Sequence, residues 1–358
     1  MDQLIQLLKA LGLPSLLAQV GGMLLVCAIV IGYISVAGMF MIWWERKISA
    51  HIQVRLGPMR VGGWHGWAQS IADGIKLLLK EDIVPATADK LVFALAPIVV
   101  FATALATYVI LPFGPGLWVK NLNIGVLYYI SISSLTVVGI IMAGWSSNNK
   151  YSVLGAMRSA AQAVSYEVPL VVSVLGVIMI VGSLNMEAIV EYQSNRVWGF
   201  FPGHWLVWGQ IVGFLCYFTA ALAECNRLPF DIPEAESELV AGFHVEYSGI
   251  RFSMFFLAEY ANMILVSCIA AALFLGGWNA PAPFLQFHGS LEHLSWLSGV
   301  LWFAVKVYFF LFLFFWLRAT LPRLRYDQLM RFGWKVMLPI ALANIVITAI
   351  AAYLFPRG

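Results

Sequence analysis

Residues 204–238 read HWLVWGQIVGFLCYFTAALAECNRLPFDIPEAESE. Up to Glu224 the stretch is mostly apolar and long enough to cross about 30 Å of hydrocarbon as one helix. The polar connection that follows is rich in acids: six carboxylates lie from Glu224 to Glu246, and the nearby bases are Arg227 and Arg251. Charge close to lipid is costly, so acids clustered at the end of a membrane helix indicate a role in handling protons or ions.

The composition extends this interpretation to the whole chain. The 358 residues are 61% hydrophobic and 11% charged, and the mean hydropathy is +0.85, which excludes a water-facing globular domain. The apolar runs are continuous rather than alternating, so they predict helices and not a barrel. We therefore expect an all-α polytopic membrane protein with a single membrane domain over 1–358. The eight expected spans are 22–44, 90–112, 124–145, 160–182, 204–224, 252–276, 299–319 and 335–355.

The basic residues predict the orientation. Of the 21 Lys and Arg, sixteen lie in or beside four connections, and four lie on the opposite side. The positive-inside rule then makes these connections cytoplasmic and puts both termini outside. The four connections are 45–89, 146–159, 225–251 and 318–335. The net charge of +3 is explained by this topology, so we expect membrane lipid and no nucleic acid as a partner.

Cysteine and histidine give no sign of a metal or redox centre. The four cysteines lack CxxC spacing and lie mostly in apolar runs, where they are typical of small core residues. The apolar runs lack the histidine pairs of a haem carrier, and no Gly-rich phosphate loop occurs. We expect no metal site, and any electron carrier would belong to a partner.

The stretch from Trp64 to Lys80 predicts an amphipathic helix in the first cytoplasmic connection. Its polar face carries Gln69, Asp73, Lys76 and Lys80. Its apolar face carries Trp67, Ile71, Ile75, Leu78 and Leu79. It is either an interfacial helix with tryptophans at headgroup depth or a cover over a cavity that admits a lipid-soluble molecule. Asp73 favours the second interpretation, because an acid gains little from facing anionic headgroups.

Three acids are expected at a similar depth within the bilayer. Glu167 and Glu259 each lie about two turns into a predicted span, and Glu224 ends a third span on the same side. Each acid alone could pair with an arginine and merely lock helices together. The set of these three acids, Glu246 and the 231–238 run outnumbers the nearby bases, which favours carboxylates that share protons. Lys306, within another predicted span, is either a snorkelling residue or a counter-ion for an acid.

Several motifs resemble one family over essentially the whole chain. They are ERK at 45–47, RLGP at 55–58, ADGIK at 72–76, AQAVSYE at 161–167, the 223–247 loop, AEY at 258–260, RATLPR at 318–323 and RYDQ at 325–328. In this order they are similar to the family that contains the H subunit of bacterial NADH-quinone oxidoreductase and subunit 1 of mitochondrial complex I.

The resemblance implies a membrane subunit of a proton-pumping NADH:quinone oxidoreductase in the bacterial cytoplasmic (inner) membrane. Such a subunit forms much of the quinone chamber and an acidic path toward the pumping subunits. It has membrane-arm and peripheral-arm subunits as partners, with FMN and iron–sulfur clusters on the latter. Its substrate is a quinone, expected to be ubiquinone.

The resemblance also implies roles for particular residues. The quinone channel would include Arg46, Arg55, Asp73, Phe230 and Phe243. The proton path would include Glu167, Glu224, Glu234, Glu238, Glu246 and Glu259. The last cytoplasmic connection would dock the peripheral arm through Arg318, Arg323, Arg325 and Asp327.

Three other functions compete with this one. The homologous component of a membrane-bound hydrogenase or ferredoxin-linked complex would keep the acids without a quinone chamber. A stand-alone ion transporter would also have intramembrane acids, but the internal repeats typical of such folds are not found in the sequence. A purely structural anchor has no need of buried acids.

Overall fold

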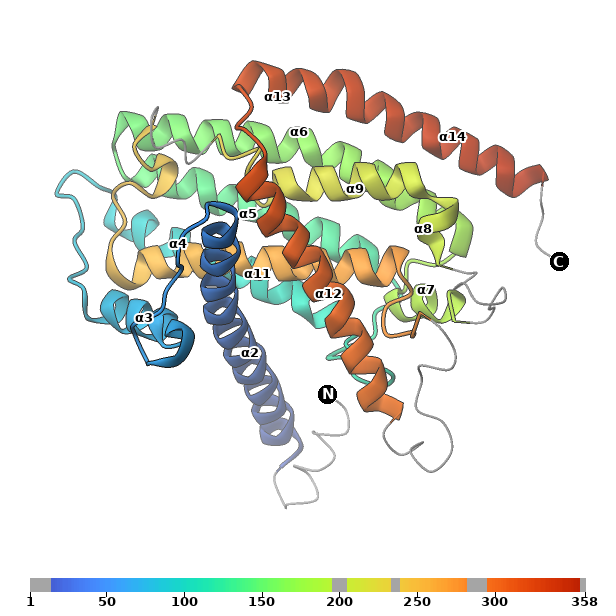
Figure 1. Cartoon of the computed structure of the whole chain (residues 1–358), viewed down its shortest axis with the longest axis horizontal. Helices are drawn as coiled ribbons and strands as arrows, with labels where there is room; N and C mark the ends of the chain where they lie inside the picture. The colour runs from blue at the N-terminus through green and yellow to red at the C-terminus, as the bar shows by residue number, and fades with distance from the viewer. Residues whose placement is uncertain (1–13, 195–204, 233–238, 282–294, 355–358) are drawn as a thin grey trace.

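The computed structural model describes residues 14–194, 205–232, 239–281 and 295–354. These residues form a bundle of helices (Figure 1), which confirms the predicted all-α class. The long helices are α2 (Ser15–Ile52), α4 (Lys90–Thr107), α5 (Gly125–Ser146), α6 (Lys150–Val181), α9 (Ile211–Glu224), α11 (Gly249–Phe274), α12 (Ser295–Thr320) and α14 (Leu338–Leu354). The shorter ones are α3 (Gln69–Leu79), α7 (Met186–Tyr192), α8 (Leu206–Gly209) and α13 (Tyr326–Phe332).

Helix α11 is the centre of the bundle. Nearly all of its residues from Phe255 to Phe274 are buried, as expected for a helix that is apolar on every side. It contacts α4, α9, α2 and α12, and in Figure 1 α2 and α12 cross in front of it. Helices α4, α5, α6 and α9 pack in sequence, so α5, α6, α9 and α11 enclose the interior that contains the predicted acids.

Seven segments of the described chain are long and apolar enough to cross a membrane, and they correspond to seven of the eight predicted spans. The remaining prediction, 204–224, differs from the structure. The described part of this run forms two shorter helices, α8 and α9. They are separated at Gln210, where φ is −132° and ψ is 40°. The Gln210 amide there donates to Thr348 Oγ1 at 2.7 Å and accepts from Asn344 Nδ2 at 2.7 Å, so a polar contact with α14 replaces one helical turn.

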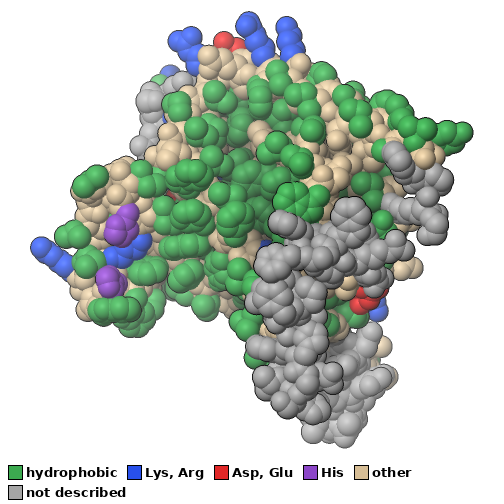
Figure 2. All heavy atoms as spheres, turned by 45° about the vertical axis from the view of Figure 1, so that its right-hand side comes forward, with side chains coloured by type: hydrophobic (Ala, Val, Ile, Leu, Met, Phe, Trp, Pro, Cys, Tyr) green, Lys and Arg blue, Asp and Glu red, His purple; other side chains and the backbone are tan. Residues whose placement is uncertain are grey.

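The surface of the bundle is suited to lipid. Large apolar side chains such as Leu24, Ile29 and Val346 are exposed. On the face shown in Figure 2 hydrophobic side chains predominate, while Lys and Arg side chains gather at its upper and left edges. The chain is therefore a multi-pass membrane protein with an apolar belt and basic margins.

Lys306 takes neither of the two roles considered from the sequence. It is buried, and its ammonium group donates to three main-chain carbonyls, those of Leu275, Gly277 and Asn279, at 2.5–2.8 Å. It also lies 4.6 Å from the centre of the Trp205 ring. Lys306 thus holds the turn that follows α11, and its partners are carbonyls because that turn is bent back toward α12.

Candidate functional site

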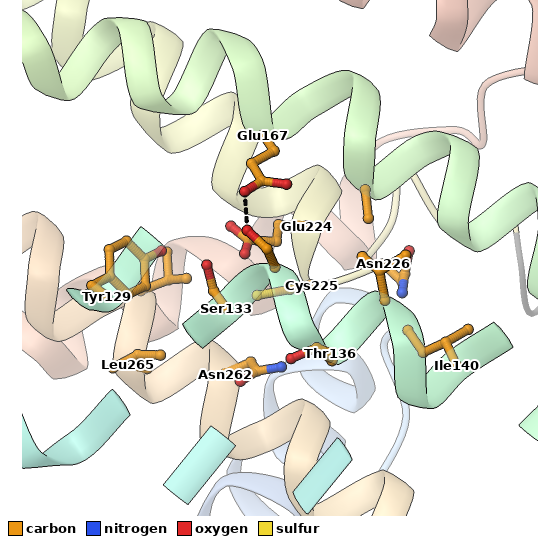
Figure 3. A pocket seen from close by; sticks show the side chains of 14 residues that line it. Tyr129, Ser133, Thr136, Ile140, Glu167, Glu224, Cys225, Asn226, Asn262 and Leu265 are labelled. Atoms are coloured by element: carbon orange, nitrogen blue, oxygen red, sulfur yellow. Dashed lines mark hydrogen bonds between the residues drawn. The ribbon is translucent and has the colours of Figure 1, made fainter. Parts of the chain in front are cut away.

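Two neighbouring cavities meet at Glu224, the last residue of α9. The first, which we call the Glu167 cavity, lies between α5, α6, α9 and α11 (Figure 3). The second, the Glu259 cavity, is bounded by α4, α5, α9, α11 and the 242–244 turn. The residues that line both are Thr136, Ile140, Glu224, Cys225, Asn226 and Asn262. The three acids expected at one depth therefore lie in a single connected region.

The Glu167 cavity combines two carboxyl groups with hydroxyl groups of α5. Ser134 Oγ donates a hydrogen bond to Glu167 Oε1, and Ser133 and Glu224 face each other across the cavity in Figure 3. Neither Glu167 nor Glu224 forms an ion pair with any described residue. The arginine-locking interpretation therefore does not hold for these two acids.

Glu259, by contrast, belongs to a buried cluster of charges. Arg227 Nε lies 2.6 Å from Glu259 Oε1, and Arg227 Nη1 lies 3.2 Å from Glu45 Oε1. Glu45 also accepts from Arg318 Nη1 and, at 2.7 Å, from Tyr260 Oη. The Arg227 and Glu45 side chains are 6% and 9% exposed. Two carboxylates are thereby joined through one guanidinium group where water provides little screening.

The sequence did not point to Glu45 or Tyr260 as site residues, whereas Arg227 was one of the arginines considered as partners of the intramembrane acids and does pair with Glu259. Glu45 and Arg227 were noted in motifs, but Arg227 is 182 positions from Glu45 and Tyr260 is 215 positions from it. One sequence feature could have identified Glu45: an acid at the inner end of a membrane helix costs free energy and therefore indicates a function. Arg318, which the resemblance gives a docking role, donates to Glu45 in this structure.

The predicted channel residues fall into two groups. Arg46 Nη1 lies 2.7 Å from Asp73 Oδ2 and so joins α2 to α3. The Arg55 side chain is exposed and donates from Nε to Gln53 Oε1 at 2.6 Å. Phe243 lines the Glu259 cavity. Phe230 lines neither cavity: its ring lies 5.5 Å from that of Tyr166, in a buried aromatic cluster.

An apolar groove opens between α2 and the 64–71 segment. It is lined by Val36, Met39, Phe40, Trp43, Trp64, His65, Trp67, Ser70 and Ile71. The Arg46–Asp73 pair is one residue from the buried Glu45 cluster along α2. The amphipathic helix was predicted correctly as α3, and it lies beside a groove that could admit an apolar chain.

Of the remaining predicted acids, only Glu246 lies within the described residues. Glu246 accepts a hydrogen bond of 2.6 Å from Asn149, just before α6 begins, and it lines neither cavity. Glu234 and Glu238 lie outside the described residues, as does Glu236. Asp231, just before that gap, pairs with Arg323 at 2.9 Å. This contact joins the 225–232 segment to the last cytoplasmic connection.

Gln162 fixes the end of α9 and hence the position of Glu224. Its fully buried amide nitrogen lies within hydrogen-bond distance of Ala223 O (2.8 Å), Phe230 O (2.7 Å) and Asn226 Oδ1 (3.2 Å). Ala223 O is one of the carbonyls that a helix end leaves without a helical partner. A side chain of α6 therefore determines where α9 stops.

Just outside the membrane segments, His244 forms part of the wall of the Glu259 cavity. It packs against Phe243, Phe252 and Phe256, with ring centres 5.0–6.2 Å apart. Burial lowers the pKa of His244 to about 4. The imidazole is therefore neutral at physiological pH and presents an uncharged wall to the acids.

Chemically, the site offers carboxyl groups in mostly apolar cavities at low dielectric. Carboxylates that share a low-dielectric region cannot all ionise without cost, and this arrangement favours shared protons. Among the described residues, no group of three or more His, Cys, Asp or Glu side chains could hold a metal ion. A bundle of membrane helices around an acid-lined interior defines a polytopic membrane protein suited to proton handling.

The comparisons with known proteins assign the family. The model of the family described as NADH dehydrogenase matches residues 24–349. The H subunit of NADH-quinone oxidoreductase from Brevibacillus brevis is 51% identical over 326 residues, which are 91% of this chain and 90% of that protein. The protein of the same name from Dehalococcoides mccartyi strain CBDB1 is 49% identical over 334 residues, 93% of this chain and 88% of that protein. The chain belongs to the NADH dehydrogenase family.

Proposed function

We propose that the chain is the membrane subunit of a proton-pumping NADH:quinone oxidoreductase that contributes the quinone chamber and an acidic path leading from it. The relatives are named as the H subunit of NADH-quinone oxidoreductase, which supports the complex and favours it over a hydrogenase or a transporter. The observation that carries the proposal is the buried charge cluster from Glu45 through Arg227 to Glu259, together with the adjoining cavities that Glu259, Glu224 and Glu167 line.

The proposed orientation puts the four basic connections in the bacterial cytoplasm and both termini outside. Contacts among these connections support it, because they bring all four to one end of the bundle. Arg251 pairs with Asp82 at 3.1 Å, Glu246 accepts from Asn149, and Leu324 N donates to Pro229 O at 3.1 Å. A peripheral arm that carries FMN and iron–sulfur clusters would dock on this end.

The quinone, ubiquinone in our proposal, would approach along the groove beside α2 and α3. The groove's tryptophan and aliphatic walls suit an isoprenoid chain, and Arg46 and Asp73 lie where a polar headgroup would leave the lipid. Arg55, Phe230 and Phe243 remain proposed neighbours of the channel once partner subunits complete it. We propose that Glu246, Glu234 and Glu238 extend the acid path at its cytoplasmic end.

In the proposed mechanism, quinone reduction by a partner's iron–sulfur cluster withdraws protons, or displaces charge, near Glu45 and Arg227. Because Arg227 is shared by Glu45 and Glu259, a change of charge at one carboxylate alters the affinity of the other for Arg227. Glu224 and Glu167 would respond by exchanging protons through the cavities. The changed protonation would shift the equilibrium of the network and so couple to remote pumps.

Two experiments test this function. Purification in mild detergent should retain a nucleotide-binding, iron–sulfur peripheral arm together with this chain. Glu224→Gln, which preserves shape but cannot ionise, should slow quinone reductase turnover and pumping together while the complex assembles. The matched control is Glu187→Gln in α7, a glutamate that lines neither cavity, which should leave both rates unchanged. Normal rates in a fully assembled Glu224→Gln complex would contradict the proposal.

A further inference from the structure

Asn262 on α11 is a polar side chain within the membrane interior that forms no hydrogen bond with the described part of the chain. Its neighbours Ala261, Met263 and Ile264 are buried, whereas Asn262 itself is only partly buried. The difference arises because Asn262 projects into space: it lines both the Glu167 cavity and the Glu259 cavity. An amide left without partners at this depth would cost several kcal/mol, about 2–7 by transfer scales, so a partner is required.

Other buried amides of this chain differ from Asn262 because each has a direct hydrogen-bond partner. Asn344 donates to Gln210 at 2.7 Å, Gln193 donates to Ala272 O at 2.9 Å, and Gln162 reaches three acceptors. These side chains join helices by direct contacts. Asn262 does not join helices in this way, although it lies in the most completely buried helix of the bundle. A role in packing therefore does not account for it.

Asn262 lies close to the acids of both cavities. It follows Glu259 by three residues, so the two side chains share one face of α11. Glu224 lines the same two cavities from α9. In Figure 3 the Asn262 amide points toward Thr136, and Glu224 lies above both. The amide therefore adjoins both the cavity lined by the Arg227-bound Glu259 and the cavity lined by Glu224 and Glu167.

Thr136 provides a second polar group at this junction. Its hydroxyl lies 3.0 Å from Thr103 Oγ1, which also lies 2.9 Å from Val100 O. If Thr103 donates to Val100 O, Thr136 donates to Thr103 and keeps lone pairs free toward the cavity. A buried water needs two to four polar partners. The junction offers three: the Asn262 amide, the Thr136 hydroxyl group and the Glu224 carboxyl group.

We propose that Asn262, Thr136 and Glu224 bind a water molecule that relays protons between Glu259 and Glu224, with Asn262 as the positioning residue. This inference rests on the proposed acid path and assigns its middle step. The water donates one proton to a carboxylate as it receives another from the opposite side, so no net charge stays on it. The amide itself neither gains nor loses a proton, and it holds the oxygen in line.

The test compares variants of the assembled complex in membranes. Asn262→Leu fills the same space without polar atoms, and Asn262→Ser keeps a hydroxyl and leaves room for water. Asn344→Leu removes an intramembrane amide elsewhere and serves as the control for packing. Quinone reductase rate, pumping and the solvent deuterium isotope effect on turnover are measured, with Glu224→Gln in parallel.

We expect Asn262→Leu to lower turnover about tenfold and to increase the solvent isotope effect, because proton transfer becomes rate-limiting. Asn262→Ser should restore both, and Asn344→Leu should leave the isotope effect unchanged. If Asn262→Leu fails to assemble, Thr136→Val replaces it, with Thr103→Val as its control. Unchanged rate and isotope effect in Asn262→Leu, or in its Thr136→Val replacement, while Glu224→Gln is impaired would overturn the water site alone. Unchanged rates in all of them would overturn the acid path as well.

Discussion

Replacing Arg227 tests how much the buried charge cluster stabilises the structure around it. Replacing Arg227 by leucine leaves Glu259, which is 16% exposed, without the guanidinium 2.6 Å away, whereas Glu45 keeps Arg318. Removing one member of a buried pair costs about 3–5 kcal/mol. Because Glu259 can take up a proton in response, the lower end, about 3 kcal/mol, applies.

Hydrogen exchange of the assembled complex measures this loss locally. The amides of Cys225, Asn226 and Arg227 are held by carbonyls of α9 at 3.1–3.3 Å, so peptides covering 222–230 report the opening of this segment. At about 1.4 kcal/mol per factor of ten, Arg227→Leu should speed their exchange about a hundredfold. Arg227→Leu combined with Glu259→Leu should recover much of the protection, because apolar replacement of both partners is nearly neutral.

The matched control is Arg251→Leu in the same connection. It forms an ion pair with Asp82, and the two side chains are 24% and 33% exposed. Solvent-accessible ion pairs contribute about 0–1 kcal/mol. The rate of hydrogen exchange in the peptides that contain Arg251 should change no more than about fivefold. Equal protection in wild type and Arg227→Leu, or no recovery in the double variant, would refute the assignment of a desolvated, mutually dependent cluster.

Three further predictions concern packing, pH and Lys306. A Cβ at Gly155 would lie 2.6 Å from the Cα of Gly242, so Gly155→Ala should destabilise the complex by about 1–3 kcal/mol in thermal dissociation, whereas Gly32→Ala, with nothing within 4 Å, should not. Burial lowers the pKa of His244 to about 4 from about 6.5. Between these two pH values the unfolded state therefore binds a proton on His244 that the folded state does not bind. The stability contributed by neutral His244 is complete above about pH 6.5 and decreases toward pH 4, by about 3 kcal/mol in all. Stability measured against pH should show this slope, and His244→Asn should abolish it. Lys306→Met should free three buried carbonyls and lower thermal stability by about 1–3 kcal/mol, and an unaltered dissociation temperature would contradict the role given to the ammonium group.

The sequence predicted the depth of the acids better than their partners. Counting turns put Glu167, Glu224 and Glu259 at one level, and they meet at adjoining cavities. A helical pattern gives the position of a residue along its own helix and the face on which it lies. It does not tell which helices are neighbours, so the Glu45–Arg227 contact, across 182 positions, could not be foreseen.

The differences in the fold have the same origin. Hydropathy predicted one span over 204–224, but Gln210 interrupts it because its amide finds Asn344 and Thr348 on α14. The two interpretations of Lys306 both assumed a charged or watery partner. The structure supplies carbonyls of a turn that is distant in sequence, and no periodicity in the sequence marks such a partner.

The central claim is that acids at the cavities change protonation when quinone is reduced. Infrared difference spectra of the assembled complex, recorded between oxidised and reduced quinone, measure this directly through the carboxyl C=O stretch. We predict a carboxyl band that shifts in D₂O, disappears in Glu224→Gln and persists in Glu187→Gln. A spectrum of Glu224→Gln identical to wild type, in a complex that still reduces quinone, would contradict the claim.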